Sequence, residues 1–309
     1  MPSSSSPVIV SIGGGKGGVG KSTLVANIGA ILCSEGSRVG FIDADLGGAN
    51  LHLCVGVRRP KFTLADYLGG RVKELSAVAV ETMVPNSWLI SGASDILGLA
   101  NPKYAQKRKL LNNIGRLDAD FILVDLGAGA DTNVTDFFAA FPFGIVVSDS
   151  LPTSIENAYG FLKNATLRGL SRLFAPQSVF RHQLYRFADP GSKGGVNSVE
   201  ELLSQVEREA PEETKRAREW LAGRGTFLVI NMVREREDVE AGRKFADIVK
   251  KYLSINLFYI GYVIQDPKMR KSQKAMRPVV TMDDAAAARE CFRAITRNLR
   301  TLTKGEAPG

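Results

Sequence analysis

The chain has 309 residues, 44% of them hydrophobic, which is enough to bury a large core, and it contains neither an apolar run of about 18 residues nor a secretory signal pattern. Its net charge of +8 favours nucleic acid, anionic lipid or an acidic protein as partner without choosing among them, and a basic enzyme without such a partner is the plain alternative. The three cysteines, Cys33, Cys54 and Cys291, lie far apart and fit a reducing cytoplasm better than a disulfide framework.

The predicted elements alternate between apolar strands and amphipathic helices. The run PVIVSI (7–12) predicts a buried strand that ends at glycines, and the spacing of apolar residues predicts a helix from Lys21 to about Ser34. Further strands are predicted over 38–43, 87–92, 120–127, 143–149, 225–233 and 255–264, and further helices over 62–70, 102–115, 154–173, 237–252 and 283–303. This alternation predicts an α/β fold with a doubly wound, mostly parallel sheet, whose ligands bind beyond the carboxyl ends of the strands.

One segment and the two ends depart from this alternation. Residues 175–222 are rich in charge and read as helical in SVEELLSQVEREAPEETKRAREWL, which predicts a helical insertion. No low-complexity linker divides the chain, so a single domain over 1–309 is expected. The polar ends, about 1–6 and 304–309, are expected to be disordered.

A phosphate-binding loop is predicted between the first strand and the first helix. The residues GKGGVGKS, from Gly15 to Ser22, match the pattern G-x-x-x-x-G-K-[ST]. The glycines let backbone amides point at phosphates, and the following helix adds the positive end of its dipole. Lys21 is expected to bind the β- and γ-phosphates and Ser22 to coordinate Mg²⁺. The general pattern leaves a second lysine, Lys16, unexplained.

Three carboxylates follow strands whose carboxyl ends are expected to meet this loop. Asp125 ends the apolar run FILVD, where a Walker-B carboxylate holds Mg²⁺ through water. Asp43 and Asp45 lie two residues apart at the end of another strand, so strand alternation predicts that both point to one face. There they suit a metal-bound water and a water aligned on the γ-phosphorus. A solvated turn for this pair and a simple strand-end residue for Asp125 are the alternatives.

The motifs KGGVGKST (16–23), DADLGGANLHLCVGV (43–57) and VDLGAGAD (124–131) resemble those of the deviant Walker-A ATPases. These P-loop NTPases, of the SIMIBI type, include the MinD, ParA and FlhG proteins. The resemblance covers almost the whole chain except about 175–222. The segments LPTSIENAYGFLK (151–163) and QKAMRPVV (273–280) resemble the FlhG and MinD subgroup most.

This resemblance implies a slow, partner-stimulated ATPase that uses ATP and Mg²⁺ and forms a homodimer in its ATP state. Lys16 would be the signature lysine that crosses to the phosphates of the second copy. Asp45 would position the attacking water, Asn231 would read the adenine edge, and Asp266 would flank the base. The implied nucleotide-binding set is Gly15, Gly17, Gly18, Val19, Gly20, Lys21, Ser22, Thr23, Asn231 and Asp266, and the implied metal set is Ser22, Asp43 and Asp125.

The chain also departs from this family pattern. Leu151 replaces a common glutamate, and Asn157 replaces an acidic residue that takes part in activation at the dimer face of MinD-like proteins, so the response to a partner is expected to differ. A separate membrane-targeting helix is expected to be absent. The apolar stripe of Ile295, Leu299 and Leu302 either lies in a membrane interface, flanked by arginines, or packs on the core, and core packing is the favoured interpretation.

A second basic region lies between residues 161 and 187. Its arginines, at positions 168, 172, 181 and 186, alternate with leucines and phenylalanines. The pattern fits contact with a partner or with an anionic surface, or an amphipathic helix whose basic face is solvated, and both interpretations stay open.

Four functions follow from these observations. The leading one is an ATPase switch that controls the placement or number of a flagellum, cell pole or division site. A ParA-like partition ATPase that binds DNA nonspecifically is the second. In either case we expect the chain to be cytoplasmic and to associate with the membrane or the nucleoid in its ATP state. An ATP-binding module without catalysis is a third. A Mrp-type iron–sulfur carrier is remote, because Cys291 is the one cysteine near the end of the sequence.

Overall fold

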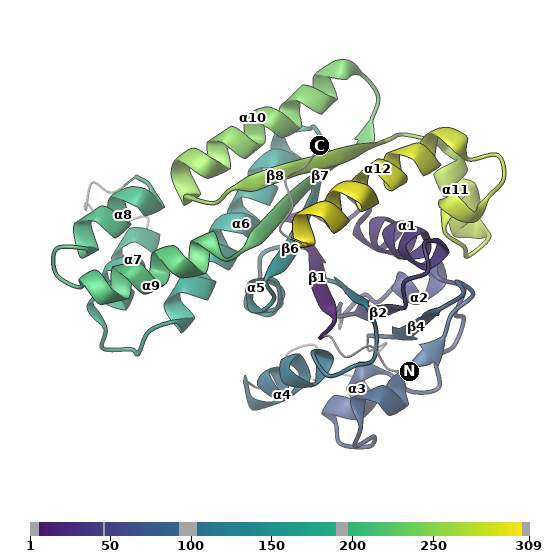
Figure 1. Ribbon diagram of the computed structural model, residues 1–309, viewed down its shortest axis with the longest axis horizontal. Coiled ribbons are helices and arrows are strands. Elements are labelled where there is room, and N and C mark those ends of the chain that lie inside the picture. The colour runs from purple at the N-terminus through teal and green to yellow at the C-terminus, as the bar shows by residue number, and fades with distance from the viewer. Residues whose placement is uncertain (1–5, 46, 93–103, 190–196, 305–309) are drawn as a thin grey trace.

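The computed structural model contains one eight-stranded sheet covered by helices on both faces (Figure 1). The structure describes residues 6–45, 47–92, 104–189 and 197–304, and the predicted disordered ends lie almost wholly outside these ranges. The strands are β1 (Val8–Gly13), β2 (Val39–Asp43), β3 (Val80–Glu81), β4 (Ser87–Ile90), β5 (Phe121–Asp125), β6 (Phe143–Ser148), β7 (Gly225–Val233) and β8 (Leu257–Ile264). Their order is β3-β4-β2-β5-β1-β6-β7-β8, and β3 alone among them pairs antiparallel. The predicted doubly wound, mostly parallel sheet is confirmed.

The helices connect these strands. They are α1 (Lys21–Ser34), α2 (Leu51–Cys54), α3 (Leu64–Leu68), α4 (Tyr104–Ile114), α5 (Thr132–Ala140), α6 (Pro152–Arg172), α7 (Val179–Ala188), α8 (Val199–Val206), α9 (Pro211–Ala222), α10 (Arg236–Leu253), α11 (Pro267–Lys274) and α12 (Ala286–Thr303). Among the described residues, no helix combines the length and apolarity that crossing a membrane requires.

Strand alternation divides the core into two layers. On β5, Phe121 and Leu123 pack with α1 and α12 on one face, whereas Ile122 and Val124 pack with α5 and α6 on the other. Because successive side chains of a strand point to opposite faces, a strand buried on both sides is apolar throughout, and this explains the run FILV. The central strands therefore have no exposed face, and polar chemistry is left to their ends.

The carboxyl-terminal helix belongs to this core. Ile295 and Leu299 of α12 are fully buried against β8 and α1, and Leu302 packs partly buried beside them. The core interpretation of the apolar stripe is confirmed, and Arg293 and Arg297 of α12 are exposed. Arg300 pairs with Glu35, the residue that follows α1.

Helices α7, α8 and α9 fill the segment between α6 and β7 and project to the left in Figure 1. The sequence predicts one helical stretch through residues 198–221, but Pro211 starts a new helix and separates α8 from α9. Proline is tolerated in the first turn of a helix and breaks its interior, which accounts for the boundary. Phe180, Leu202 and Leu221 are buried in the same core layer as α6.

Candidate functional site: a phosphate-binding loop with a buried carboxylate cluster

The loop between β1 and α1 presents a helix N-terminus free of side-chain caps. Gly18 and Gly20 have φ of +78° and +92°, a backbone region that side chains rarely adopt. Gly20 caps α1, whose first turn contains no acidic residue and makes no side-chain hydrogen bond at its cap. The first amides of α1 are therefore available to an anion, and the helix dipole favours one there.

Close packing fixes the loop against α6. A Cβ on Gly15 would lie 1.9 Å from the carbonyl oxygen of Asn157, in the second turn of α6. On the strand side, a Cβ on Gly14 would lie 2.6 Å from the carbonyl oxygen of Val147. Glycine at these positions lets the loop pack directly against both backbones.

Lys21 points into the site of its own chain. The residue is buried, and burial lowers the pKa of its ammonium group, an effect that the nearby charges of Asp125 and Asp45 oppose. Its Nζ donates a long hydrogen bond of 3.5 Å to the carbonyl oxygen of Lys16. A cation held in this way, with weak partners and little solvent, is suited to binding an anion.

Asp125 lies beside Lys21 at the carboxyl end of β5. Its neighbours in the sheet register are Ile12 of β1 and Asp43 of β2, so two carboxylates end adjacent strands. Burial raises the pKa of Asp125 to about 7, whereas a hydrogen bond with Ser22 and the charge of Lys21 lower it. Its Oδ1 atom is buried without a hydrogen-bond partner in the described structure. An unsatisfied buried oxygen of this kind is costly and fits a site completed by a ligand.

Asp43 and Asp45 have different surroundings. Asp43 is fully buried, and its two oxygens accept hydrogen bonds from the backbone amides of Asp45 (3.1 Å) and Leu51 (3.0 Å). Burial is also the main cause that raises the pKa of Asp43 well above its ordinary value. Strand β2 ends at Asp43, so strand alternation does not extend to Asp45. Asp45 is half-buried in the following loop, and its Oδ1 accepts from the amide of Gly47 at 3.2 Å.

Lys16, the second lysine of the loop, turns to α6 instead. Its Nζ donates to the hydroxyl oxygen of Ser154 at 3.4 Å, and the residue is half-exposed. Ser154 itself is buried at the start of α6. The two lysines, five positions apart in sequence, therefore have different neighbours.

A cavity of about 980 Å³ adjoins the loop on the side of β7 and β8. Its walls bring together Gly18, Gly20, Thr23, Asn231 and Asp266, which sequence reasoning proposed as nucleotide contacts. Further lining residues that the sequence motifs did not indicate are Met232, Arg234, Gln265, Met269, Arg270 and Phe292. One signal was present in the sequence, because Arg234 and Gln265 directly follow the predicted strands 225–233 and 255–264.

Two polar side chains of this cavity already have hydrogen-bond partners. Asn231 donates from Nδ2 to the carbonyl oxygen of Val19 at 2.8 Å, and Asp266 caps α11 by accepting from the amide of Lys268 at 2.8 Å. Asn231 therefore ties β7 to the phosphate loop, and Asp266 shapes the cavity through α11. We propose that these two side chains contact the base of a nucleotide. To do so, the amide group of Asn231 would have to break its hydrogen bond with the carbonyl oxygen of Val19.

The residues present fit a nucleotide with Mg²⁺. Ser22 and Asp125 offer a hydroxyl and an unsatisfied carboxylate oxygen, the hard oxygen ligands that Mg²⁺ prefers. Across the described ranges, no three His, Cys, Asp or Glu side chains gather closely enough to hold a metal by themselves. A Mg²⁺ ion here would therefore need phosphate oxygens and water to complete its coordination, as is usual at phosphate-transfer sites.

A strand, a glycine-rich loop with a lysine, a helix N-terminus and a carboxylate on the neighbouring strand define a P-loop nucleotide-binding protein. The match to a family model makes this specific. Residues 10–297 match the CobQ/CobB/MinD/ParA nucleotide-binding domain, and the chain belongs to this family.

Individual relatives agree with this assignment. The antiactivator FleN of Pseudomonas aeruginosa is 27% identical over 295 residues, which cover 94% of this chain and 85% of FleN. The flagellum site-determining protein YlxH of Helicobacter pylori is 35% identical over 159 residues, which cover 50% of this chain and 52% of YlxH. The septum site-determining protein MinD of Pyrococcus horikoshii, solved with Mg-ADP, shares the fold with a TM-score of 0.66 at 21% identity and covers 97% of this chain and 99% of its own.

Proposed function

We propose that this chain is a Mg²⁺-dependent ATPase that works as a dimerising switch. The observation that carries the proposal is the division of labour between the two lysines of the loop. Lys21 lies near Asp125 and Asp45 of its own chain. Lys16 is half-exposed and donates a hydrogen bond to Ser154 of α6. A lysine so placed is free to reach the nucleotide of a second copy, as an arginine finger does.

The residues of the chain have distinct tasks in this proposal. When bound, ATP with Mg²⁺ supplies the γ-phosphoryl group and neutralises part of its charge. Lys21 and the loop amides bind the phosphates, and Ser22 and Asp125 hold the metal. Asp45 is half-buried near Lys21 and Asp125. It orients the attacking water and accepts a hydrogen bond from it. Asp43 holds the backbone of Asp45 and the start of α2 at Leu51 through its two hydrogen bonds.

The cellular role rests on the relatives. FleN is an antiactivator, YlxH determines the site of a flagellum, and MinD determines the site of a septum. We therefore propose that this switch controls the placement or number of a flagellum, cell pole or division site. A protein partner would stimulate hydrolysis. Such switches act through the different affinities of the two nucleotide states for a partner, and slow turnover is expected.

A ParA-like partition ATPase is the second candidate. Arg293, Arg297, Arg300 and Lys304 line one hollow on the outer side of α12, which also includes Glu35. This basic surface favours nonspecific contact with DNA phosphates. Side-by-side assays at one salt concentration separate the two: ATP-dependent co-sedimentation with anionic liposomes, and mobility shift on random DNA. The leading proposal expects no shift on DNA, and an ATP-dependent shift favours the partition role.

Asp45→Ala tests the switch itself. The variant should bind ATP with Mg²⁺ and accumulate as a dimer, because its site lacks the group that orients the water while its phosphate contacts stay intact. Size-exclusion chromatography with light scattering measures the change from the 33.4 kDa chain to a pair. Asp247→Ala, a change at an exposed residue of α10, serves as the control. A monomeric Asp45→Ala protein in saturating ATP would contradict the dimerising switch.

A further inference from the structure

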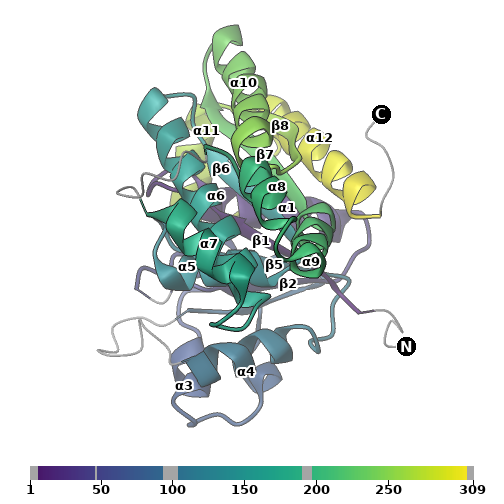
Figure 2. The ribbon, with the colours of Figure 1, turned by 90° about the vertical axis from the view of Figure 1, so that its left-hand side faces the viewer.

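A second basic pocket lies away from the phosphate loop, between α4, α5, α6 and α7. Its volume is about 530 Å³, and its walls include the cations Lys107, Arg108, Arg168, Arg172 and Arg181 with the carboxylate Asp136. In Figure 2, α5, α6 and α7 lie left of centre and α4 lies below them. Arg168 is roughly 20 Å along α6 from Ser154, so the pocket is separate from the nucleotide site.

The floor of the pocket is a buried cluster of charges. Asp136, 1% exposed, accepts from Lys107 Nζ at 2.7 Å, from Arg168 Nη2 at 2.9 Å and from Arg172 Nη2 at 2.6 Å. Lys107 is itself buried, whereas the two arginines are partly exposed. A structural ion pair needs one cation for its carboxylate, and this carboxylate has three. The arrangement holds two surplus positive charges in fixed positions.

Two further arginines add to this surplus. Arg108 is exposed on α4 and makes no ion pair with any other described residue. Arg181 of α7 donates only to neutral oxygens, the carbonyl of Phe174 at 3.2 Å and the hydroxyl of Tyr185 at 3.3 Å. Its Nε atom is buried and has no hydrogen-bond partner in the described structure. The pocket thus has five cations against one carboxylate and an unsatisfied donor in its wall.

We propose that this basic pocket is a second anion site, which binds a small molecule with at least two phosphate charges. A concave site of several hundred Å³ fits a small ligand rather than a nucleic-acid duplex or a flat protein surface. Guanidinium groups match phosphate oxygens with paired hydrogen bonds, and a phosphate monoester at neutral pH has nearly two negative charges and three acceptor oxygens. The ligand would neutralise the surplus charge that Asp136 leaves.

Inorganic pyrophosphate is the probe for this site. Binding is measured by titration calorimetry, without Mg²⁺, on the full chain with Lys21→Ala, so that the phosphate loop contributes little. In this background, the double change Arg108→Ala with Arg181→Ala should weaken pyrophosphate binding at least about tenfold, because it removes two cations that do not contact Asp136. Arg108→Gln alone, a mild change at an exposed site, should weaken it in the same direction.

The matched control is Arg293→Ala with Arg297→Ala on α12, which removes the same charge from another basic hollow and should leave binding unchanged. Citrate is the second arm, because it has a similar charge on carboxylates, and it should compete weakly. Absence of pyrophosphate binding, or equal losses in the pocket and control variants, would overturn the site. Citrate that binds as tightly as pyrophosphate would overturn the assignment to phosphates. These measurements involve no ATP turnover, so they stand apart from the switch proposal.

Discussion

At the scale of single residues, Asp125 shows how a buried ligand-binding carboxylate lowers the stability of the folded protein when no ligand is bound. Its carboxylate is buried, it neighbours Asp43 in the sheet, and one of its oxygens is unsatisfied. Burial raises its pKa from 3.8 to about 7. The folded chain then binds more protons than the unfolded chain between these values, so stability falls as the pH rises through this window and stays reduced above it.

Asp125→Asn should therefore stabilise the nucleotide-free protein at pH 8 while removing Mg²⁺-dependent ATP hydrolysis. Removing a carboxylate whose charged form is disfavoured relieves its burial cost and its repulsion with Asp43 and Asp45. Thermal melts at pH 5 and pH 8 measure the effect. The wild type should lose more stability than Asp125→Asn over this range, and Asp247→Asn, at an exposed site, should follow the wild type. A lower melting temperature for Asp125→Asn at pH 8 would contradict this account.

At the scale of elements, α6 connects the phosphate loop with the basic pocket. Its first turns contact Lys16 and Gly15, and its last turns provide Arg168 and Arg172 to Asp136. The same helix therefore contributes both to the packing of the phosphate loop and to the ion pairs of the basic pocket.

Gly15→Ala tests the contact at the loop end of α6. The added Cβ would lie 1.9 Å from the carbonyl oxygen of Asn157, so the loop or α6 must shift, and overpacking of this kind costs about 1–3 kcal/mol. Gly17→Ala is the matched control, because its Cβ would meet only Ala128, at an ordinary 3.7 Å. Denaturant unfolding without nucleotide should show a clear loss for Gly15→Ala and little change for Gly17→Ala. Equal stabilities would show that the contact does not hold the loop.

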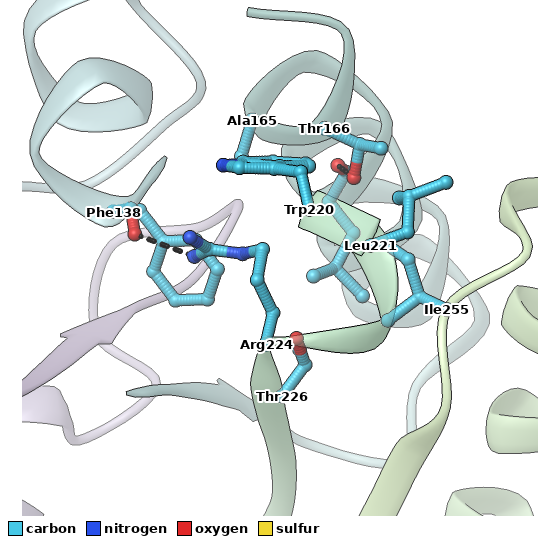
Figure 3. A pocket seen from close by; sticks show the side chains of 9 residues that line it. Phe138, Ala165, Thr166, Trp220, Leu221, Arg224, Thr226 and Ile255 are labelled. Carbon is cyan, nitrogen blue, oxygen red and sulfur yellow. Dashed lines mark hydrogen bonds between the residues drawn. The ribbon is translucent and has the colours of Figure 1, made fainter. Parts of the chain in front are cut away.

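Arg224 contacts α9 and α5, and Figure 3 shows its side chain beside Trp220 with its hydrogen bond to Phe138. It precedes β7, stacks 4.7 Å from the ring of Trp220 on α9, and donates to the carbonyl oxygens of Phe138 and Ala139 at the end of α5, both at 2.9 Å. Burial lowers its pKa to about 10, so it stays charged at neutral pH.

Arg224→Lys should destabilise the fold by about 1–3 kcal/mol, because lysine keeps the charge but cannot donate to two carbonyls while stacking on a ring. Denaturant unfolding of Arg224→Lys beside Arg208→Lys, at an exposed position, measures the loss. If the two variants unfold alike, the contacts of Arg224 contribute nothing to stability.

At the scale of the whole molecule, the sequence predicts the elements and loops whose structure depends on neighbouring residues in the chain. The run FILVD and the glycine-rich loop were readable because burial on both faces and phosphate binding each require a particular local composition. The helices α5, α7 and α11 were not predicted as separate elements. Asp136 was missed because its partners Lys107 and Arg168 lie 29 and 32 residues away, and only the fold brings them together. The backbone role of Asp43, whose partners Asp45 and Leu51 are two and eight residues away, was also not predicted.

The central claim is that Lys16 completes the active site of a second copy, and complementation between two inactive variants tests it most directly. Lys16→Ala and Asp45→Ala should each lose ATP hydrolysis. A mixed dimer would contain one complete site, with Asp45 from one chain and Lys16 from the other. When equal amounts are mixed before ATP is added, the initial rate should be about a quarter of the wild-type rate, since about half of the dimers are mixed and each has one complete site of two. Dimers isolated through two different tags and found inactive would contradict the claim.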